Sequence, residues 1–466
     1  MKWPVRWTRD AFQRFASVDR IGGSYQWFIY LLSTILMNDA TLGAPATLAR
    51  APSLTSNQSR VIAACSVGNA LEMYDFTVYS FFAVMIGKLF FPATSPYASL
   101  LLAVATFGIG FVMRPLGGFV IGSYADRSGR KAAMTLTIGL MVVGTLCIAC
   151  APTYAMAGAW GPAIIVAGRL LQGFSLGGEI GASTSMLMEA GGVQRRGYRI
   201  SWQAASQGAA ALLGAATGTA LYALMPAESL EAWGWRLPFL LGLLIAPVGL
   251  YIRANLDETL PEHAHEASPL RTLFREHGLS VLQGVLSITA GTVAMYLVVF
   301  YMPTYMIRVL GMPSSLSLLS GCVAGATMIV SSLLAGRIAD RLVRRKPIAL
   351  AALLATTTLI YPAFWLINTY PSVPLVLAVT ATLTALGNIG SAPMLLLIME
   401  MLPAGVRASG LSVIYSIGVT IFGGSSQAVV TWLIGVTGNP MAPALYMMAC
   451  GVVTLFALSS IRETGR

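Results

Sequence analysis

The chain has 466 residues, of which 56% are hydrophobic and only 10% are charged. Soluble domains carry about 25% charged residues, so this composition excludes a disordered chain, a collagen and an ordinary cytosolic globule. A net charge of +11 is common in nucleic-acid-binding proteins. Here, however, the basic residues fall in loops between apolar segments, which favours a membrane protein.

The first 59 residues are a basic extension with one short apolar segment, Tyr25 to Met37. That segment is too short to span a bilayer, because a spanning helix needs about 20 apolar residues. A signal peptide is not favoured, since the first spanning helix needs a cytoplasmic start. We expect residues 1–59 to be a cytoplasmic extension. It is either an interfacial amphipathic segment or the product of an overlong gene model whose real start is Met37.

Twelve later segments are long and apolar enough to cross the bilayer as helices. They lie near residues 60–87, 97–124, 131–151, 160–188, 198–224, 235–254, 279–308, 315–339, 347–369, 373–400, 408–435 and 441–461. Fifteen Lys and Arg residues fall on one side of these spans, whereas Lys88, Arg236 and Arg308 fall on the other. The first side, which includes both termini, is therefore predicted to be cytoplasmic.

The longest connection, 255–278, divides the spans into six and six and is predicted to be a cytoplasmic linker. The two halves also repeat a loop: Gly122–Lys131 matches Gly336–Arg345 with a constant offset of 214 residues. Parallel six-helix repeats are a known plan for transporters. We predict an all-α membrane protein with an N-terminal bundle at 60–254 and a C-terminal bundle at 279–462.

At Gly122–Lys131 the residues resemble the signature loop of the major facilitator superfamily. The segment Arg169–Gly173 is similar to that superfamily's fourth-helix motif, which is associated there with proton coupling. Over about 60–462, the chain resembles the metabolite:proton symporters, which import citrate, 2-oxoglutarate, shikimate, proline and betaine. The segments that carry this resemblance are Gly68–Phe76, Arg114–Gly118, Gly168–Glu179 and Trp233–Phe239. Three further segments look most like the citrate and tricarboxylate members: Ser201–Gln207, Tyr301–Tyr305 and Ile421–Gly424. The resemblance implies the major facilitator fold, with twelve transmembrane helices in two pseudo-symmetric six-helix bundles.

Five ionisable residues fall well inside the predicted spans, and all lie in the first half: Glu72, Asp75, Arg114, Arg169 and Glu179. Each costs about 2.5–3.5 kcal/mol at mid-bilayer on insertion scales, so they are expected to face a polar interior and to pair with one another. Three acids against two arginines leave one acid without a basic partner. That acid is the natural proton carrier.

We predict Asp75 or Glu72 as the proton carrier, with Glu179 as the second choice. Glu72 and Asp75 are three residues apart on one helix face, where two carboxylates cannot both ionise cheaply. Arg169 lies ten residues from Glu179, or about 15 Å along a helix, which is too far for a direct pair. We expect Arg169 to meet the first helix, as in the superfamily motif. The alternative is that these pairs only hold helices together.

An anionic substrate also needs a cation, and guanidinium groups bind carboxylates bidentately. Arg114 and Arg169 are therefore the candidate substrate-binding residues. Polar neighbours expected to complete the site are Asn69, Gln203, Gln207, Tyr296, Tyr301, Tyr305, Asn388 and Tyr415. We predict a proton-coupled secondary transporter that imports a small organic acid, of citrate, tricarboxylate or dicarboxylate type, by alternating access.

The repeated loop has a second expected role. In the superfamily it is a conformational latch between the halves, which here implies Gly122, Asp126, Arg127, Arg130, Lys131, Asp340 and Arg341. For Arg130 and Lys131, positive-inside topology is an equally good explanation. For Asp126 the latch is favoured, because an acid contributes little to topology.

An enzyme is not predicted, because the three histidines share one polar loop and the sequence has no nucleotide-binding motif or metal-ligand spacing. The five cysteines lie within apolar segments, which is not typical of a disulfide framework. We expect a monomer in the cell inner membrane that uses the proton gradient, with no cofactor and no nucleic-acid partner. Three alternatives stay open: proton symport of a zwitterion such as proline or betaine, an exporter, and a transporter-like sensor.

Overall fold

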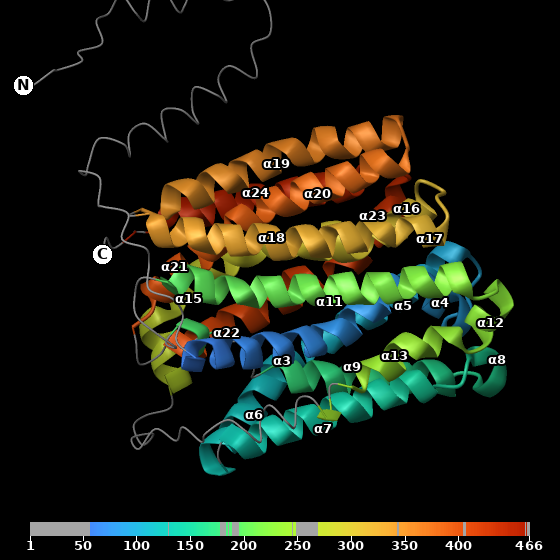
Figure 1. Ribbon diagram of the computed structural model, residues 1–466, viewed down its shortest axis with the longest axis horizontal. Helices are drawn as coiled ribbons and strands as arrows, with labels where there is room; N and C mark the ends of the chain where they lie inside the picture. Colours follow the sequence, from blue (N-terminus) through green and yellow to red (C-terminus); the bar gives the residue numbers. More distant parts are fainter. Residues whose placement is uncertain are drawn as a thin grey trace, which may run out of the picture. The chain divides into compact units, whose positions relative to one another are not determined.

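Every element in the described part of the chain is a helix (Figure 1). In chain order the helices fall on the predicted spans, except that the short helices at 154–157 and 227–232 lie between spans. The structure is a computed structural model. It describes residues 56–128, 130–177, 183–184, 186–188, 195–244, 246–247, 269–342, 344–403, 407–461 and 463. The predictions for residues 1–55, for Glu179 and for 255–268 lie outside these residues.

The first half contains long helices joined by short ones. Their bounds are α3 (Ser56–Phe81), α4 (Ala83–Phe90), α5 (Pro96–Val112), α6 (Arg114–Ser128), α7 (Arg130–Cys150), α8 (Tyr154–Ala157), α9 (Trp160–Leu176), α11 (Arg196–Leu224), α12 (Ala227–Ala232), η2 (Gly234–Arg236) and α13 (Leu237–Gly242). The sixth predicted span is described only as far as residue 247.

The second half contains α15 (Pro269–Ala294), η3 (Met295–Tyr301), α16 (Met302–Arg308), α17 (Ser314–Ser317), α18 (Leu319–Arg341), α19 (Lys346–Thr369), α20 (Val373–Ile389), α21 (Ser391–Met401), α22 (Arg407–Gly418), η5 (Val419–Gly424), α23 (Ser426–Thr437) and α24 (Ala442–Ser460). Two of these elements, η3 and η5, are short π-helices. Segments of this kind often mark functional sites in helical proteins.

Among the described residues, seven helices are long and apolar enough to cross a membrane. The pair α3 and α4 is an eighth candidate if it is one span, bent by 64°. The helix α15 starts at Pro269, earlier than the predicted 279, and has a non-helical residue at His277. The last part of the predicted linker is therefore helical.

The contact between α11 and α18 joins the two halves along their length (Figure 1). Glycines allow the two backbones to approach closely, because a Cβ on Gly208 would lie 2.8 Å from the carbonyl oxygen of Gly325. Small residues commonly make such contacts between membrane helices, where close backbone packing replaces hydrophobic driving force.

A second set of close contacts brings α9 against α5 and α7. A Cβ on Gly110 would lie 2.9 Å from the carbonyl oxygen of Arg169, and one on Gly144 would lie 2.8 Å from that of Gly168. A Cβ on Gly173 would overlap the carbonyl oxygen of Gly110. These contacts place the part of α9 that carries Arg169 in the middle of the first half.

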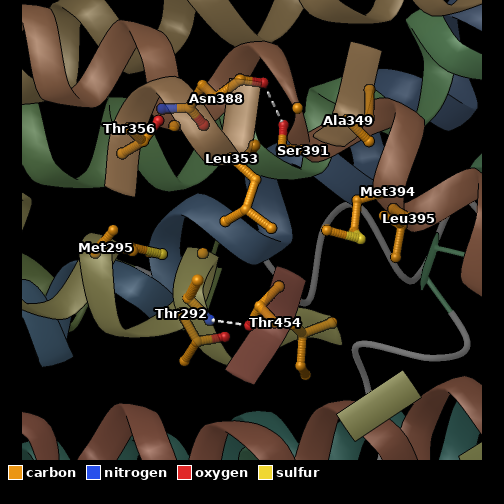
Figure 2. A pocket seen from close by; sticks show the side chains of 18 of the residues that line it. Thr292, Met295, Ala349, Leu353, Thr356, Asn388, Ser391, Met394, Leu395 and Thr454 are labelled. Atoms are coloured by element: carbon orange, nitrogen blue, oxygen red, sulfur yellow. Dashed lines mark hydrogen bonds between the residues drawn. The ribbon is translucent and has the colours of Figure 1, made fainter. Parts of the chain in front are cut away.

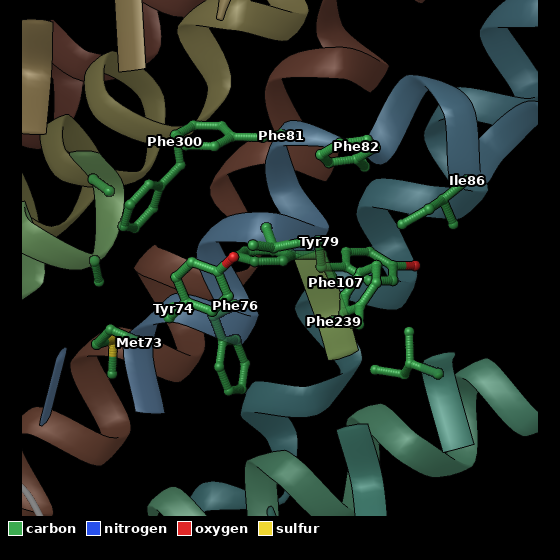
Figure 3. Packing of buried hydrophobic residues seen from close by; sticks show 14 of the residues in the cluster. Met73, Tyr74, Phe76, Tyr79, Phe81, Phe82, Ile86, Phe107, Phe239 and Phe300 are labelled. Atoms are coloured by element: carbon green, nitrogen blue, oxygen red, sulfur yellow. The ribbon is translucent and has the colours of Figure 1, made fainter. Parts of the chain in front are cut away.

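Aromatic residues fill the space between these helices. Figure 3 shows Phe76, Tyr79 and Phe107 gathered in one cluster of buried side chains. The same cluster includes Tyr296 and Phe300 of η3, so the apolar core of the first half continues into the second half.

We predict that Gly173→Ala lowers the free energy of unfolding by about 1–3 kcal/mol, because α5 and α9 must move apart to admit the methyl group. The measurement is thermal unfolding of the purified protein in detergent. The control is Gly139→Ala on α7, where a Cβ meets nothing within 4 Å; it should be neutral or stabilising by about 0.5–1 kcal/mol. Equal stabilities for the two variants would contradict the predicted close packing.

Candidate functional site

Three of the predicted ionisable residues lie together in the first half and are fully buried. Asp75 comes from α3, Arg114 from the first residue of α6, and Arg169 from α9. Glu72, one turn before Asp75, is also buried and acts electrostatically on Arg114. Charges at this depth are costly unless they are compensated, so their surroundings decide what the site can do.

Polar side chains from α7 and α9 surround the carboxylate of Asp75. The hydroxyl of Thr145 donates a hydrogen bond to Oδ2 of Asp75. The Nε2 atom of Gln172 lies 3.3 Å from the same oxygen and 3.0 Å from Oγ1 of Thr145. The Oε1 atom of Gln172 accepts a 2.7 Å hydrogen bond from Nη1 of Arg169. The amide of Gln172 therefore connects the acid to the arginine.

Aromatic rings cover both guanidinium groups. The Cζ atom of Arg169 lies 4.0 Å from the ring centre of Tyr79 and 4.5 Å from that of Phe76. The Cζ atom of Arg114 lies 4.1 Å from the ring centre of Phe111, and Phe76 lies between the two arginines at 5.3 Å from Arg114. Cation–π contacts compensate part of the lost hydration, with about 0.5–2 kcal/mol each.

Both arginines keep hydrogen-bond donors without partners among the described residues. These donors are Nε and Nη2 of Arg114 and Nε and Nη2 of Arg169. A buried donor that lacks an acceptor costs about 1–3 kcal/mol, and more when it is charged. Two guanidinium groups with free donors can bind a carboxylate, which offers two oxygens for them.

Arg114 also connects the site to the second half. Its guanidinium group interacts electrostatically with Tyr296 in η3. The next residue, Pro115, has no N–H and cannot bond the carbonyl of Phe111 four residues earlier. That carbonyl accepts a 2.8 Å hydrogen bond from Oγ1 of Thr420 in η5 instead. Both π-helices of the second half therefore meet the arginine cluster.

A cavity of about 210 Å³ lies mainly in the second half, and Asp75, Arg114 and Arg169 are not among the described residues that line it. Gln203 and Gln207 of α11 line it, and Figure 2 shows Thr356 and Asn388 on one side and Thr292 on the other. The hydroxyl groups of Ser287 and Thr384, which also line the cavity, have no partner among the described residues. These groups are available to a polar ligand.

Tyr415 links the cavity to the charged cluster, since it lines the cavity and acts electrostatically on Arg114. Asn69 lies behind the cavity wall, where its amide bonds Ser206 and Gln203 and holds α3 against α11. Gln203 contributes to both the helix contact and the cavity, whereas Asn69 contributes only to the contact.

The two predicted tyrosines of the second half lie elsewhere. Tyr301 bonds Thr431 at 2.8 Å, and Tyr305 bonds Asn368 and the carbonyl of Pro440. Both are packed in the apolar core of the second half and are not among the described residues that line the cavity. Their hydroxyls already have partners, so we leave both tyrosines out of the proposed site.

The second copy of the repeated loop makes a contact between the halves. The carboxylate of Asp340, near the end of α18, accepts hydrogen bonds from the backbone N–H groups of Gly197 at 2.6 Å and Tyr198 at 2.9 Å. These N–H groups belong to the first turn of α11, which has no intrahelical acceptors for them. The side chains of the first loop copy, Gly122, Asp126, Arg127, Arg130 and Lys131, lie outside the described residues.

Four residues of the site were not singled out from the sequence as site residues. Gln172 stands in the fourth-helix motif, which was the available signal for it. Thr145, Thr420 and Gly242 lie in apolar segments that have no distinguishing pattern. Only the folded chain shows that Thr145 bonds Asp75 and that Gly242 packs against it.

Comparisons with known proteins identify the family. The family model of the Major Facilitator Superfamily matches residues 65–426. The citrate-proton symporter of Klebsiella pneumoniae is 35% identical over 395 residues, which cover 84% of this chain and 88% of that protein. The proline/betaine transporter of Salmonella typhimurium is 31% identical over 420 residues, which cover 87% and 83%.

A solved D-xylose-proton symporter has the same fold, with a TM-score of 0.71 and 18% identity over 88% of this chain and 98% of that one. The predicted fold of two six-helix bundles is thereby confirmed. The relatives are transporters and not enzymes. From the family match and the identity to these relatives over most of its length, the chain belongs to the Major Facilitator Superfamily and is a multi-pass membrane transporter.

Proposed function

We propose that the chain imports a small organic acid, such as citrate or a chemically similar carboxylate, together with protons and by alternating access. Its similarity to a citrate-proton symporter supports this assignment. The observation that carries it is the pair of buried arginines, Arg114 and Arg169, which have free donors, and the connection of Arg169 through Gln172 to a buried carboxylate, Asp75. An acid that can be neutralised near two cations is suited to couple the binding of a proton to the binding of an anion.

Charge balance gives a reason for coupling. Moving one negative charge inward against 100 mV costs about 2.3 kcal/mol, and protons that travel with the substrate cancel this cost. When Asp75 is ionised, it offsets part of the charge of Arg169 through Gln172. When Asp75 is protonated, the arginine pair has excess positive charge and attracts an anion.

A zwitterion such as proline or betaine is the second candidate, because a relative carries that name. A quaternary ammonium group is usually bound by aromatic rings. In the described site the rings of Phe76, Phe111 and Tyr79 already cover the two arginines. This arrangement favours an anion. An exporter or a sensor is distinguished from an importer by measured uptake.

The remaining parts of the proposal follow from topology and charge. We assign both termini to the cytoplasm of a cell inner-membrane protein, on the distribution of Lys and Arg. The transporter is proposed to act as a monomer that uses the proton gradient and no cofactor. Glu72 and Glu179 remain secondary candidates for the proton carrier.

The repeated loops are proposed as latches between the halves, with Asp126 and Asp340 as the main residues. The contact of Asp340 with the first turn of α11 supports this role, because a carboxylate at a helix N-terminus stabilises the unpaired N–H groups there. Gly122, Arg127, Arg130, Lys131 and Arg341 are assigned to the same loops.

Replacing Asp75 by Asn is expected to abolish proton-driven uptake and to leave substrate exchange intact, because the amide fills the same space but cannot take up a proton. Uptake and counterflow of labelled citrate in proteoliposomes, with and without a proton gradient, measure both. The control is Glu231→Gln, an exposed acid of the same half that pairs with Lys88. Normal proton-driven uptake by Asp75→Asn would contradict the assignment.

We expect Asp340→Ala to slow uptake several-fold while the KM for citrate changes by less than about twofold, since the latch is distant from the ligand and contributes about 0.3–1 kcal/mol to one access state. Initial rates over a range of citrate concentrations measure both constants. Lys346→Ala is the control, because among the described residues the side chain of Lys346 bonds only the carbonyls of Ser459 and Ile461, which belong to its own half. A large rise in KM alone would count against a latch.

Substrate class is tested with a panel of citrate, tricarballylate, 2-oxoglutarate, shikimate and betaine in one uptake assay. Citrate or another carboxylate should be taken up, and betaine should not compete.

Arg114→Gln should raise the KM for the carboxylate about tenfold or more, because a charged hydrogen bond of about 1.5–3 kcal/mol is lost. Uptake of betaine alone, unaffected by Arg114→Gln, would support the zwitterion instead.

A further inference from the structure

The link between Asp75 and Arg169 in the described residues passes through one neutral side chain. Gln172 donates from Nε2 to Oδ2 of Asp75 at 3.3 Å and accepts at Oε1 from Nη1 of Arg169 at 2.7 Å. An amide has its donor and its acceptor on different atoms. Reversing this amide would place its oxygen against the carboxylate and its NH₂ group against the guanidinium group, so the two charges together dictate its orientation.

Thr145 makes the link sensitive to a proton. Its hydroxyl donates to Oδ2 of Asp75 and accepts from Nε2 of Gln172 at 3.0 Å. A hydroxyl can exchange these roles, since it has one hydrogen and two lone pairs. Once Oδ2 carries a proton, Asp75 becomes a donor to Thr145, and Oδ2 no longer attracts the N–H of Gln172.

Close packing prevents the network from relaxing in other ways. Asp75, Thr145, Arg169 and Gln172 all have no exposed surface. A Cβ on Gly144 would lie 2.8 Å from Cγ of Gln172, and one on Gly242 of α13 would overlap Oδ1 of Asp75. A change in hydrogen bonding at Asp75 must therefore be passed to the amide of Gln172, because neither the acid nor its neighbours have room to move away.

The other charged and titratable groups around the network set its charge balance. Those that face it in the described part of the chain are Arg169 of α9, Arg114 of α6, Tyr296 of η3, and Glu72, Tyr74 and Tyr79 of α3 itself. The helices α7 and α13 face it with Thr145 and Gly242, which do not ionise. Asp75 is therefore the acid whose proton acts on Arg169 through Gln172.

We propose that Gln172 is a positioning residue that reports the protonation state of Asp75 to Arg169. While Asp75 is ionised, Gln172 is held between the two charges and occupies Nη1 of Arg169. When Asp75 is protonated, the amide is released, and Nη1 joins Nε and Nη2 of Arg169 as donors available to a carboxylate. The proton therefore binds before the substrate. This inference rests on the proposed function of Asp75 and Arg169.

Two substitutions of Gln172 should change the KM for citrate in opposite directions. Gln172→Met keeps the size and removes both hydrogen bonds, so Arg169 is available at every pH. Its KM should be lower than that of the unmodified protein at high pH, and the rise of KM with pH should become shallower. Gln172→Glu places a carboxyl group on Arg169, and the KM should rise about tenfold or more at every pH where this introduced group is ionised.

The experiment measures the KM for citrate in proteoliposomes between pH 5.5 and 8.5, at a fixed membrane potential. The measurements are made at pH values about half a unit apart, so that the titration of a single group can be followed. Ser175→Ala on the same helix is the control: Ser175 is buried, and in the described part of the chain its side chain bonds only the carbonyl of Thr137. The Ser175→Ala variant should show the same dependence of KM on pH as the unmodified protein. A purely structural role for Gln172 would lower the amount of active protein and leave the pH profile of KM unchanged in both variants.

Thr145 provides an independent check if a Gln172 variant does not fold. In Thr145→Val the rise of KM with pH should be shallower than in the unmodified protein. In Thr145→Ser, which keeps the hydroxyl, the rise should be as steep as in the unmodified protein. An unchanged pH profile in Gln172→Met and Thr145→Val, alongside loss of proton-driven uptake in Asp75→Asn, would overturn this inference and leave the proposed function intact. Uptake that does not depend on a proton gradient in the unmodified protein would overturn both.

Discussion

The compensation of buried charge is the constraint on which the rest of the structure depends. Asp75, Arg114 and Arg169 are fully buried at membrane depth, where an uncompensated ion is costly. Glycine contacts bring α9 close enough to α5 and α7 for Gln172 and Thr145 to reach Asp75. Aromatic rings cover the arginines. The compensation is incomplete, since several guanidinium donors have no partner among the described residues. In the proposed function, these free donors bind the anionic substrate.

The same cluster lies where the two halves touch. Pro115 leaves the carbonyl of Phe111 without its helical partner, and Thr420 of η5 bonds it from the other half. Tyr296 of η3 reaches Arg114 from the same side. Two π-helices of the second half therefore lie next to the charged cluster of the first half. Irregular helices can change their hydrogen bonding locally, which suits them to the movement that alternating access requires.

Much of the fold could be predicted from composition and periodicity, because the bilayer imposes a minimum length and an apolar surface on every spanning helix. The positions of the twelve spans and the charged residues within them came from this constraint. Helix breaks were harder to predict. The bend between α3 and α4 and the π-helices result from packing between helices, and the early start of α15 lies in a segment whose composition resembles a loop.

The sequence by itself determined that the chain spans a membrane, that it is built as two repeats, and that costly charges occur only in the first half. These are local properties, because each depends on the identity of residues within one helix or loop. The tertiary structure decided how the charges are connected. It put Gln172 between Asp75 and Arg169, packed Tyr301 and Tyr305 into the apolar core of the second half, and opened a cavity that Tyr415 lines. Such contacts join residues that are far apart in the chain, and their geometry depends on how closely the helices pack. No pattern within a single helix can specify that packing.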